Sequence, residues 1–198
     1  MLYLYVPNCT ALTTAPELPA TTLAQYCYQY MFQNCTSLTT APELPATTLS
    51  GFFCYKGMFS GCTSLTTAPE LPATTLSGGC YYEMFSGCTS LTTAPELPAM
   101  TLTDQCYTYM FQNCTALTTA PELPATTLAQ NCYSYMFDGC SNLNYIKALF
   151  TTTPGSSYTG YWVRGVSATG TFVKNSAATW NRNGYDGVPS GWTIQTYP

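Results

Sequence analysis

Carboxylates recur along this 198-residue chain at a fixed interval, and their spacing is the first that could serve chemistry. One glutamate stands in each copy of the heptapeptide TAPELPA, at Glu17, Glu43, Glu70, Glu96 and Glu122. If successive copies stack as strands about 4.8 Å apart, these carboxylates form one row. Like charges about 5 Å apart repel by roughly 0.8 kcal/mol in water, so the side chains either splay into solvent or meet cations. The row therefore predicts either a solvated, purely solubilising edge or a linear anionic face that binds Ca²⁺ or a basic partner.

Cysteine is the second recurring reactive residue, with eleven copies. We expect no metal site, because the chain lacks histidine and any C-x-x-C pair, and the two cysteines of each repeat stand eight residues apart. If the segment between them is helical, their Cα atoms lie about 12 Å apart, beyond the disulfide limit of about 7 Å. We therefore expect reduced, stacked thiols that fill the interior as small hydrophobes.

The chain offers no recognisable catalytic arrangement, so we expect a protein that is not an enzyme. Nucleophilic triads and dyads that depend on histidine are unavailable, and glycine-rich phosphate loops are missing from the sequence. The carboxylates occupy equivalent repeat positions, whereas a glycosidase needs two carboxyl groups in different environments. No catalytic residue and no cofactor is therefore assigned, apart from the calcium hypothesis for the glutamates.

Aromatic residues are the other candidates for binding. A tyrosine follows the first cysteine of each repeat, at Tyr28, Tyr55, Tyr81, Tyr107 and Tyr133. Stacking would set these rings in a row about 5 Å apart, either as a binding surface or as a cover for the core. The three tryptophans, Trp162, Trp180 and Trp192, lie near the C-terminus, where they could form stacking platforms for a glycan.

Threonine pairs such as Thr39 and Thr40 raise the idea of an ice-binding array, because repeated threonines on a flat solenoid face can bind ice. The two threonines are adjacent, so only one of each pair should face outward from an extended strand, and Met100 interrupts one column. Ice binding is therefore not favoured.

Charge is distributed unevenly, and this limits the partners that the chain can have. Up to Asn144 eight acidic residues face one lysine, a net charge of −7, whereas four basic residues face one acidic residue afterwards, a net charge of +3. We expect no nucleic-acid binding, because no basic stripe is present. No apolar run approaches the ~20 residues that cross a bilayer, so membrane insertion is not expected either.

The repeat period predicts the fold. The second cysteine of each unit forms the series Cys9, Cys35, Cys62, Cys88, Cys114 and Cys140, with spacings of 26 or 27 residues. Such a period is typical of a solenoid, in which no unit buries its apolar face alone. Residues 1–143 are expected to form one degenerate repeat and five full repeats. Because Met1 falls inside the degenerate repeat, we expect the chain to be a piece of a longer protein.

Each repeat should contain two elements. SLTTAPEL has paired threonines and nearby prolines, which favour a short extended strand. CYQYMFQN ends in Asn or Gly, residues that tolerate a left-handed turn, and we interpret it as one or two turns of α or 3₁₀ helix. The recurring apolar positions, represented by Cys35, Leu38, Ala41, Leu44, Leu49, Cys54, Met58 and Phe59, should line the interior.

With these elements in place, the chain resembles a known family. CTSLTTAPELPATTL…CYKGMFSGC carries the C-x-x-L, L-P and F-x-x-C of the BspA-like, or Treponema-type, leucine-rich repeats of bacterial surface proteins. The units here are about three residues longer, and Ala41 stands where that family prefers Ile. The resemblance implies a right-handed solenoid, an extracellular or cell-surface location, and adhesion to a protein or glycan on a host or neighbouring cell. A phage tail or fibre component in a virion is the alternative, and the oligomeric state is open.

Residues 144–198 differ from the repeats, being rich in Gly, Ser, Thr and aromatics. YWVRGVSATGTFVK predicts a hairpin, with SATG between two strands, and GWTIQTY predicts a third strand. We expect a small β unit that caps the open end of the solenoid, since an uncapped end would expose core columns. A carbohydrate-binding module is the alternative interpretation of the same segment.

Overall fold

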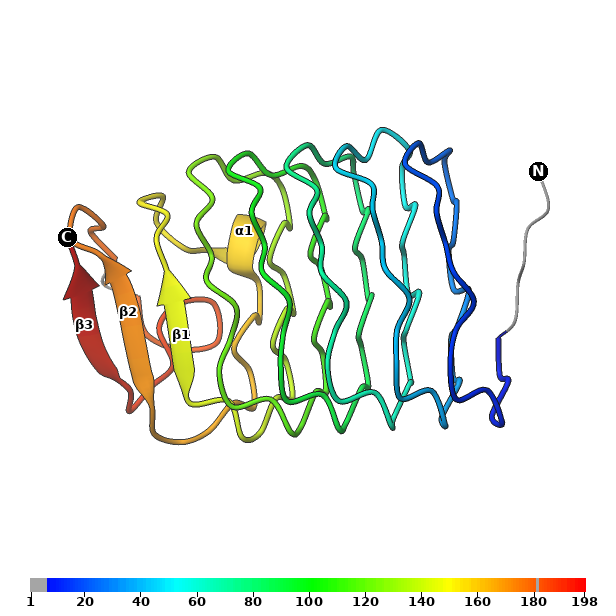
Figure 1. Cartoon of the computed structure of the whole chain (residues 1–198). Helices are drawn as coiled ribbons and strands as arrows, with labels where there is room; N and C mark the ends of the chain where they lie inside the picture. Colours follow the sequence, from blue (N-terminus) through cyan, green and yellow to red (C-terminus); the bar gives the residue numbers. More distant parts are fainter. Residues whose placement is uncertain (1–6, 181) are drawn as a thin grey trace.

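The chain winds as a stack of coils, which run from the N-terminal end to the C-terminal end of an elongated molecule (Figure 1). This computed structural model describes residues 7–180 and 182–198. Isolated parallel bridges join threonines one repeat apart, among them Thr14 with Thr40 and Thr67 with Thr93. The repeats therefore form a solenoid-type fold, as the period predicts. The strands shrink to single bridges because the prolines of TAPELPA have no N–H to donate. The right-handed sense of winding stays a prediction.

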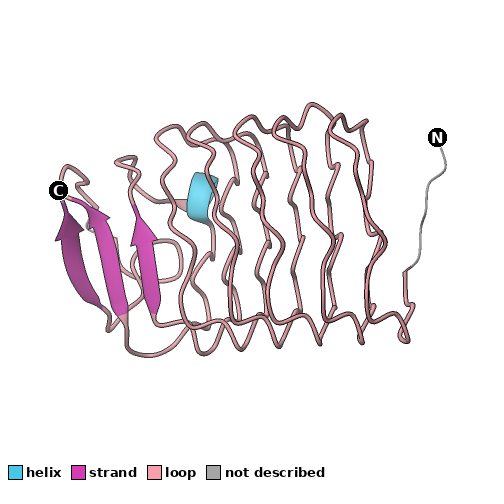
Figure 2. Cartoon of the chain, in the orientation of Figure 1, coloured by secondary structure: helices cyan, strands magenta, loops and turns pink. Residues whose placement is uncertain are grey.

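The segment between the two cysteines of each repeat is not helical, which corrects the prediction for CYQYMFQN (Figure 2). Every fourth residue adopts a left-handed φ, as at Tyr26 (59°), Tyr30 (54°) and Asn34 (57°). The N–H of Gln33 donates to Tyr30 in its own coil at 3.2 Å, whereas the N–H of Asn34 donates to Ser60 of the next coil at 2.7 Å. This alternation replaces a helix by overlapping turns that are hydrogen-bonded across coils.

The predicted interior columns line the core. Within the second repeat Cys54, Met58 and Phe59 are 0% exposed, and the leucine columns are buried as well, while Ala41 is only half-buried. Equivalent phenylalanines stack on one another along the axis, with ring centroids 5.7 Å apart between Phe59 and Phe85. Because each side chain packs on its own copy in the adjacent coil, one packing solution serves every repeat.

The C-terminal segment continues the parallel stacking. It contains β1 (Tyr145–Ala148), the single-turn α1 (Ser156–Thr159), β2 (Thr171–Asn175) and β3 (Thr193–Tyr197). Both strand pairs are parallel, with Ile146 opposite Phe172 and Phe172 opposite Ile194. The hairpin prediction is therefore wrong: residues 161–165 form turns, and the strands follow one another in the same direction around successive coils. The domain division at residue 143 stays a prediction.

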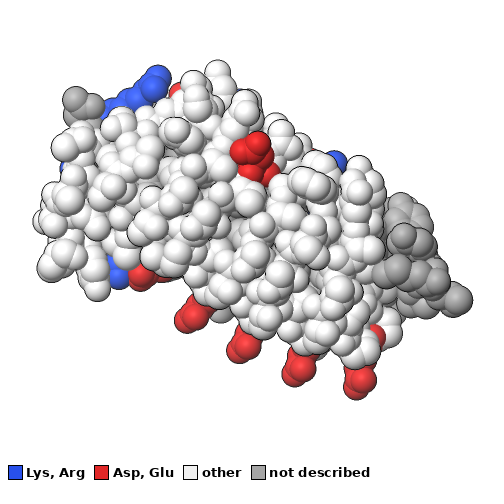
Figure 3. Space-filling view, turned by 90° about the horizontal axis from the view of Figure 1, so that it is seen from above, with Lys and Arg blue, Asp and Glu red and all other residues white. Residues whose placement is uncertain are grey.

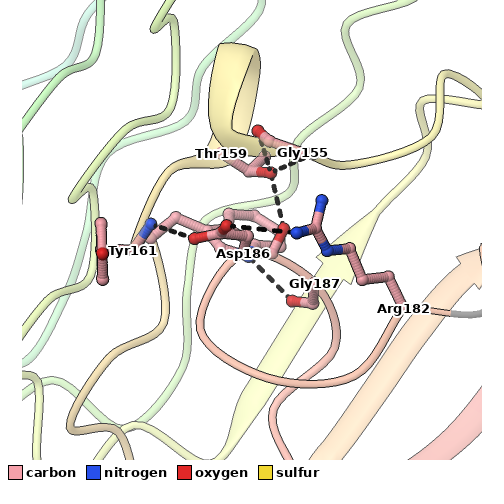
Figure 4. A network of polar contacts seen from close by, with 7 residues as sticks. Gly155, Thr159, Tyr161, Arg182, Asp186 and Gly187 are labelled. Atoms are coloured by element: carbon pink, nitrogen blue, oxygen red, sulfur yellow. Dashed lines mark hydrogen bonds and ion pairs between the residues drawn. The ribbon is translucent and has the colours of Figure 1, made fainter.

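A polar network ties the last coil to α1 (Figure 4). The hydroxyl of Thr159 donates to the carbonyl of Asp186 at 2.7 Å, and the N–H of Tyr161 donates to the Asp186 carboxylate at 2.7 Å. Arg182 lies 3.8 Å from the same carboxylate. Thr159 is fully buried, so its bonds satisfy a polar group that water cannot reach. Within the described residues, no helix is long and apolar enough to span a membrane.

Candidate interaction surfaces

The TAPELPA segments build one face of the solenoid, which we call the glutamate face; it is defined by Glu17, Glu43, Glu70, Glu96 and Glu122. All five glutamates are exposed, and acidic side chains project side by side from one edge of the molecule (Figure 3). Prolines flank each glutamate and fix the backbone that carries it. The predicted row of carboxylates is therefore present as an exposed row, and its role in binding stays a prediction.

Shallow hollows lie between successive segments of the glutamate face. One of about 380 Å³ is lined by Pro42, Glu43 and Leu44 from one coil and by Pro69 and Glu70 from the next. Similar hollows follow along the face, with volumes of about 380 to 550 Å³. Each combines apolar proline walls with carboxylates at the rim. Such a surface suits the aliphatic stem and charged head of a lysine or arginine side chain.

The chain itself places a lysine on this face. Lys147 Nζ lies 2.8 Å from a carboxylate oxygen of Glu122, in the coil that follows. The same ammonium sits 3.9 Å from the centre of the Tyr197 ring. Its hydrogen bond to Glu122 raises the pKa of Lys147 above its ordinary value, so the ion pair persists at neutral pH. A cationic side chain therefore fits the glutamate row from the position of a neighbouring coil.

Threonines border the glutamate face on both sides. Both members of each pair are exposed, as at Thr39 and Thr40 and at Thr47 and Thr48, which corrects the expectation that only one would face outward. The first member of a pair can turn its hydroxyl to the preceding coil, as Thr39 does to the Thr13 carbonyl at 3.2 Å. Because charged glutamates stand between the two threonine tracks, this face still does not resemble an uncharged ice-binding plane.

The tyrosines that follow the first cysteines are not a binding surface, contrary to one of the two predictions for them. Tyr55, Tyr81, Tyr107 and Tyr133 are each 1% exposed, and Tyr28 is half-buried. Their rings stack 5.8 to 5.9 Å apart inside the core. The column is regular as predicted, but it faces inward because the turn segment alternates differently from a helix. These rings stabilise the coils.

The tryptophans are also buried, which removes the predicted glycan platforms. Trp162, Trp180 and Trp192 are 0%, 4% and 7% exposed. The indole N–H of Trp162 donates to the Gly187 carbonyl at 2.8 Å, and that of Trp192 donates to the Ser167 carbonyl at 2.7 Å. Buried rings cannot stack on a sugar in solution. Their contacts are those of a unit that packs onto the repeats.

A second aromatic column reaches the surface, and the sequence analysis missed it. Tyr109, Tyr135, Tyr161 and Tyr185 stack with centroids 4.6, 5.4 and 6.4 Å apart, and Tyr161 and Tyr185 are 45% and 58% exposed. Cations lie on these rings: Arg164 is 5.4 Å from the Tyr161 ring centre. The repeated second tyrosine of C-Y-x-Y-M-F was the available signal, but neither a helical nor a strand period assigns it to the surface.

Arg164 is held in place by a buried carboxylate. It makes two contacts of 2.7 Å with Asp138, and the amide of Gln112 donates to the same carboxylate at 3.0 Å. Burial alone would raise the pKa of Asp138, but the hydrogen bonds from Arg164 and Gln112 and the positive charge outweigh it and lower the pKa. Asp138 is therefore ionised at neutral pH. It links the last repeat to the tail.

The thiols lie inside, where they make hydrogen bonds. Those of Cys62, Cys88 and Cys114 each donate to the carbonyl of a phenylalanine about one coil earlier, at 3.1 Å. Burial raises the pKa of the Cys62 thiol to about 12, so it stays protonated and unreactive. Within residues 7–180 and 182–198, no three His, Cys, Asp or Glu side chains gather closely enough to hold a metal ion.

Comparison with known proteins identifies the repeats. The family model for the BspA type leucine rich repeat region, with six copies, matches residues 54–159. None of the curated proteins compared with this chain matches it, and neither does any of the solved structures. The matched region includes the hydrogen-bonded turns, the two cysteine columns and three of the five glutamates, Glu70, Glu96 and Glu122.

Proposed function

Because the chain belongs to the BspA-type leucine-rich repeat family, we propose that it is a non-enzymatic adhesion or protein-interaction module at a cell surface. Repeat solenoids of this kind offer long, regular surfaces that bind extended partners. The site that we assign is the glutamate face, and the partner is a basic segment of a protein on a host or neighbouring cell. A phage virion is the alternative location.

The observation that carries this proposal is the ion pair between Glu122 and Lys147 at 2.8 Å. Glu122 meets a lysine from the adjoining coil, whereas Glu17, Glu43, Glu70 and Glu96 have an acidic residue as the equivalent neighbour. Their mutual repulsion, roughly 0.8 kcal/mol per neighbouring pair in water, is relieved when a partner brings cations. A lysine-rich or arginine-rich segment that runs along the axis would repeat the Glu122 contact at each coil.

Calcium is the second cation to test. A carboxylate row attracts it, but Ca²⁺ takes six to eight oxygen ligands, and no three acidic side chains cluster among the described residues. A basic segment needs only one carboxylate per contact. The geometry therefore favours a polypeptide partner over a metal ion.

Thermal unfolding in the presence of polylysine tests the assignment. We expect polylysine to raise the melting temperature at low salt, and the rise to shrink near 0.15 M salt, where the Debye length is about 8 Å. The triple variant Glu43→Gln, Glu70→Gln, Glu96→Gln should lose this response while its own fold is retained. The same titration with Ca²⁺ should give a smaller shift than polylysine.

A matched pair of double variants separates the face from net charge. Glu70→Gln with Glu96→Gln removes two charges from the glutamate face, and Glu83→Gln with Asp104→Asn removes two charges from the turn segments. The first pair should weaken the polylysine response more than the second. Equal responses from the triple variant and the parent would assign the glutamates to solubility alone.

A further inference from the structure

The C-terminal end of the stack is an open parallel edge. All five residues of β3 are exposed, and none of them is charged. Ile194 ends a column that is buried elsewhere: its partners Ile146 and Phe172 are 0% exposed, whereas Ile194 is 45% exposed. An uncharged edge with an exposed apolar residue is the type of strand that pairs with another strand.

The N-terminal end shows the complementary feature. Cys9 is exposed although the later members of its column, such as Cys62 and Cys88, are 0% exposed. Leu12 is half-buried although its repeat equivalent Leu38 is 0% exposed. The first coil therefore presents core-column residues on the side away from the second coil.

We propose that the C-terminal edge of one molecule binds the first coil of a second copy, head to tail. The bridge columns supply the register. One column begins at Thr14, paired with Thr40, and the corresponding column of the tail pairs Thr119 with Tyr145, Tyr145 with Thr171 and Thr171 with Thr193. Thr14 of a second copy takes the place one coil beyond Thr193. Ile194 is then covered by the coil that carries Ala15, as each internal coil covers the one before it.

Charge favours this partner over a β3-to-β3 pairing. The segment from Tyr145 onward has a net charge of +3, and the part before it has −7. Head-to-tail contact brings the basic end of one copy to the acidic repeats of another, whereas joining two C-terminal ends brings like charges together. The contact is heterologous, so it leaves one free edge and one free first coil on every assembly and continues without closure.

The experiment measures mass against concentration by sedimentation velocity, with reductant present so that Cys9 forms no disulfide. The parent should grow beyond a dimer as concentration rises. Ile194→Lys and, separately, Cys9→Lys should weaken association at least about tenfold. Met100→Lys is the matched control, because Met100 is apolar and 47% exposed but lies in the middle of the array. It should associate like the parent, and circular dichroism checks that each variant is folded.

Mixing the two blocked variants decides the geometry. Ile194→Lys retains a good first coil and Cys9→Lys retains a good edge, so an equimolar mixture should form dimers that stop at two chains. A parent that stays monomeric at every concentration overturns the proposal, and so does a Met100→Lys variant that is as impaired as Ile194→Lys. Cys9→Lys dimers equal to those of the parent would indicate β3-to-β3 pairing and also overturn it. No polycation is present, so these outcomes are independent of the glutamate-face test.

Discussion

The guanidinium of Arg164 clamps the carboxylate of Asp138 through two contacts of 2.7 Å, one from Nε and one from a terminal nitrogen. Asp138 belongs to the last full repeat and Arg164 to the coil that follows. Asp138 is only 6% exposed, so breaking the pair strands a largely buried charge. The clamp is thus a polar fastening between the repeats and the tail.

Stability should fall in acid because of this clamp. The pKa of Asp138 is lower in the folded protein than its ordinary value near 3.9, so the stabilisation is complete above that value and is lost as pH falls through the folded pKa. Asp138→Asn should cost on the order of 1–2 kcal/mol at pH 7. It should also flatten the decline of the melting temperature between pH 5 and pH 3, about the range in which an aspartate titrates. Glu96→Gln is the exposed control, and an unchanged acid profile in Asp138→Asn would contradict the role of the clamp.

Most thiols should be present but inaccessible. In native protein without reductant, a thiol reagent should react quickly with the exposed Cys9 and slowly with buried thiols such as Cys62, whose pKa of about 12 keeps it protonated. After denaturation most of the eleven cysteines should titrate. Recovery of two or fewer thiols would mean that the columns are oxidised and that the stacked-thiol interpretation fails.

Glycine at position 87 should be required for its backbone conformation, not for space. Gly87 has φ of 75°, and a Cβ there would meet nothing closer than 3.7 Å. Gly87→Ala should therefore cost about 1 kcal/mol of unfolding free energy through strain alone. Gly87→Asn should cost less, because Asn34 and Asn113 hold the same column at φ of 57° and 59°. Urea denaturation compares the two, and equal losses would refute the conformational explanation.

Removing the tail should expose the core. Tyr133 and Phe137 each pack against the Trp162 ring at 6.3 Å, so a chain that ends at Leu143 leaves both rings without their cover. We expect that shortened chain to aggregate or self-associate in light scattering. If it stays monomeric and as stable as the parent, the tail is an independent module and not a cap.

The interior was predictable because repetition itself carries the information. Columns such as Leu38 and Phe59 recur every 26 or 27 residues, and only a stacked fold uses such recurrence. The turn segment was not predictable, because its left-handed positions are occupied by Tyr30 and Glu83 as well as by Gly57, and only glycine marks such a conformation in a sequence. Helical or strand periods therefore misplaced the two tyrosine columns.

The tail was misread for a related reason. SATG has the composition of a hairpin turn, yet Thr171 lies 26 residues after Tyr145 and pairs with it in parallel. The spacing of the repeats persists there after their letters have gone. Composition had suggested exposed tryptophans, but the coil geometry places them inward as the large side chains that fill the last turns.

The near-identity of the middle coils has a consequence for how the chain finds its native arrangement. A coil that pairs through alternate N–H groups with its neighbour can pair almost equally well with the next copy along, looping out one unit, so several misaligned arrangements compete in free energy. Such competition is typical of repeat arrays. Only unique partners break the degeneracy, and they gather where Asp138 meets Arg164 and where Glu122 meets Lys147. The non-repetitive end therefore acts as a counting device, which tells the chain which coil is the last.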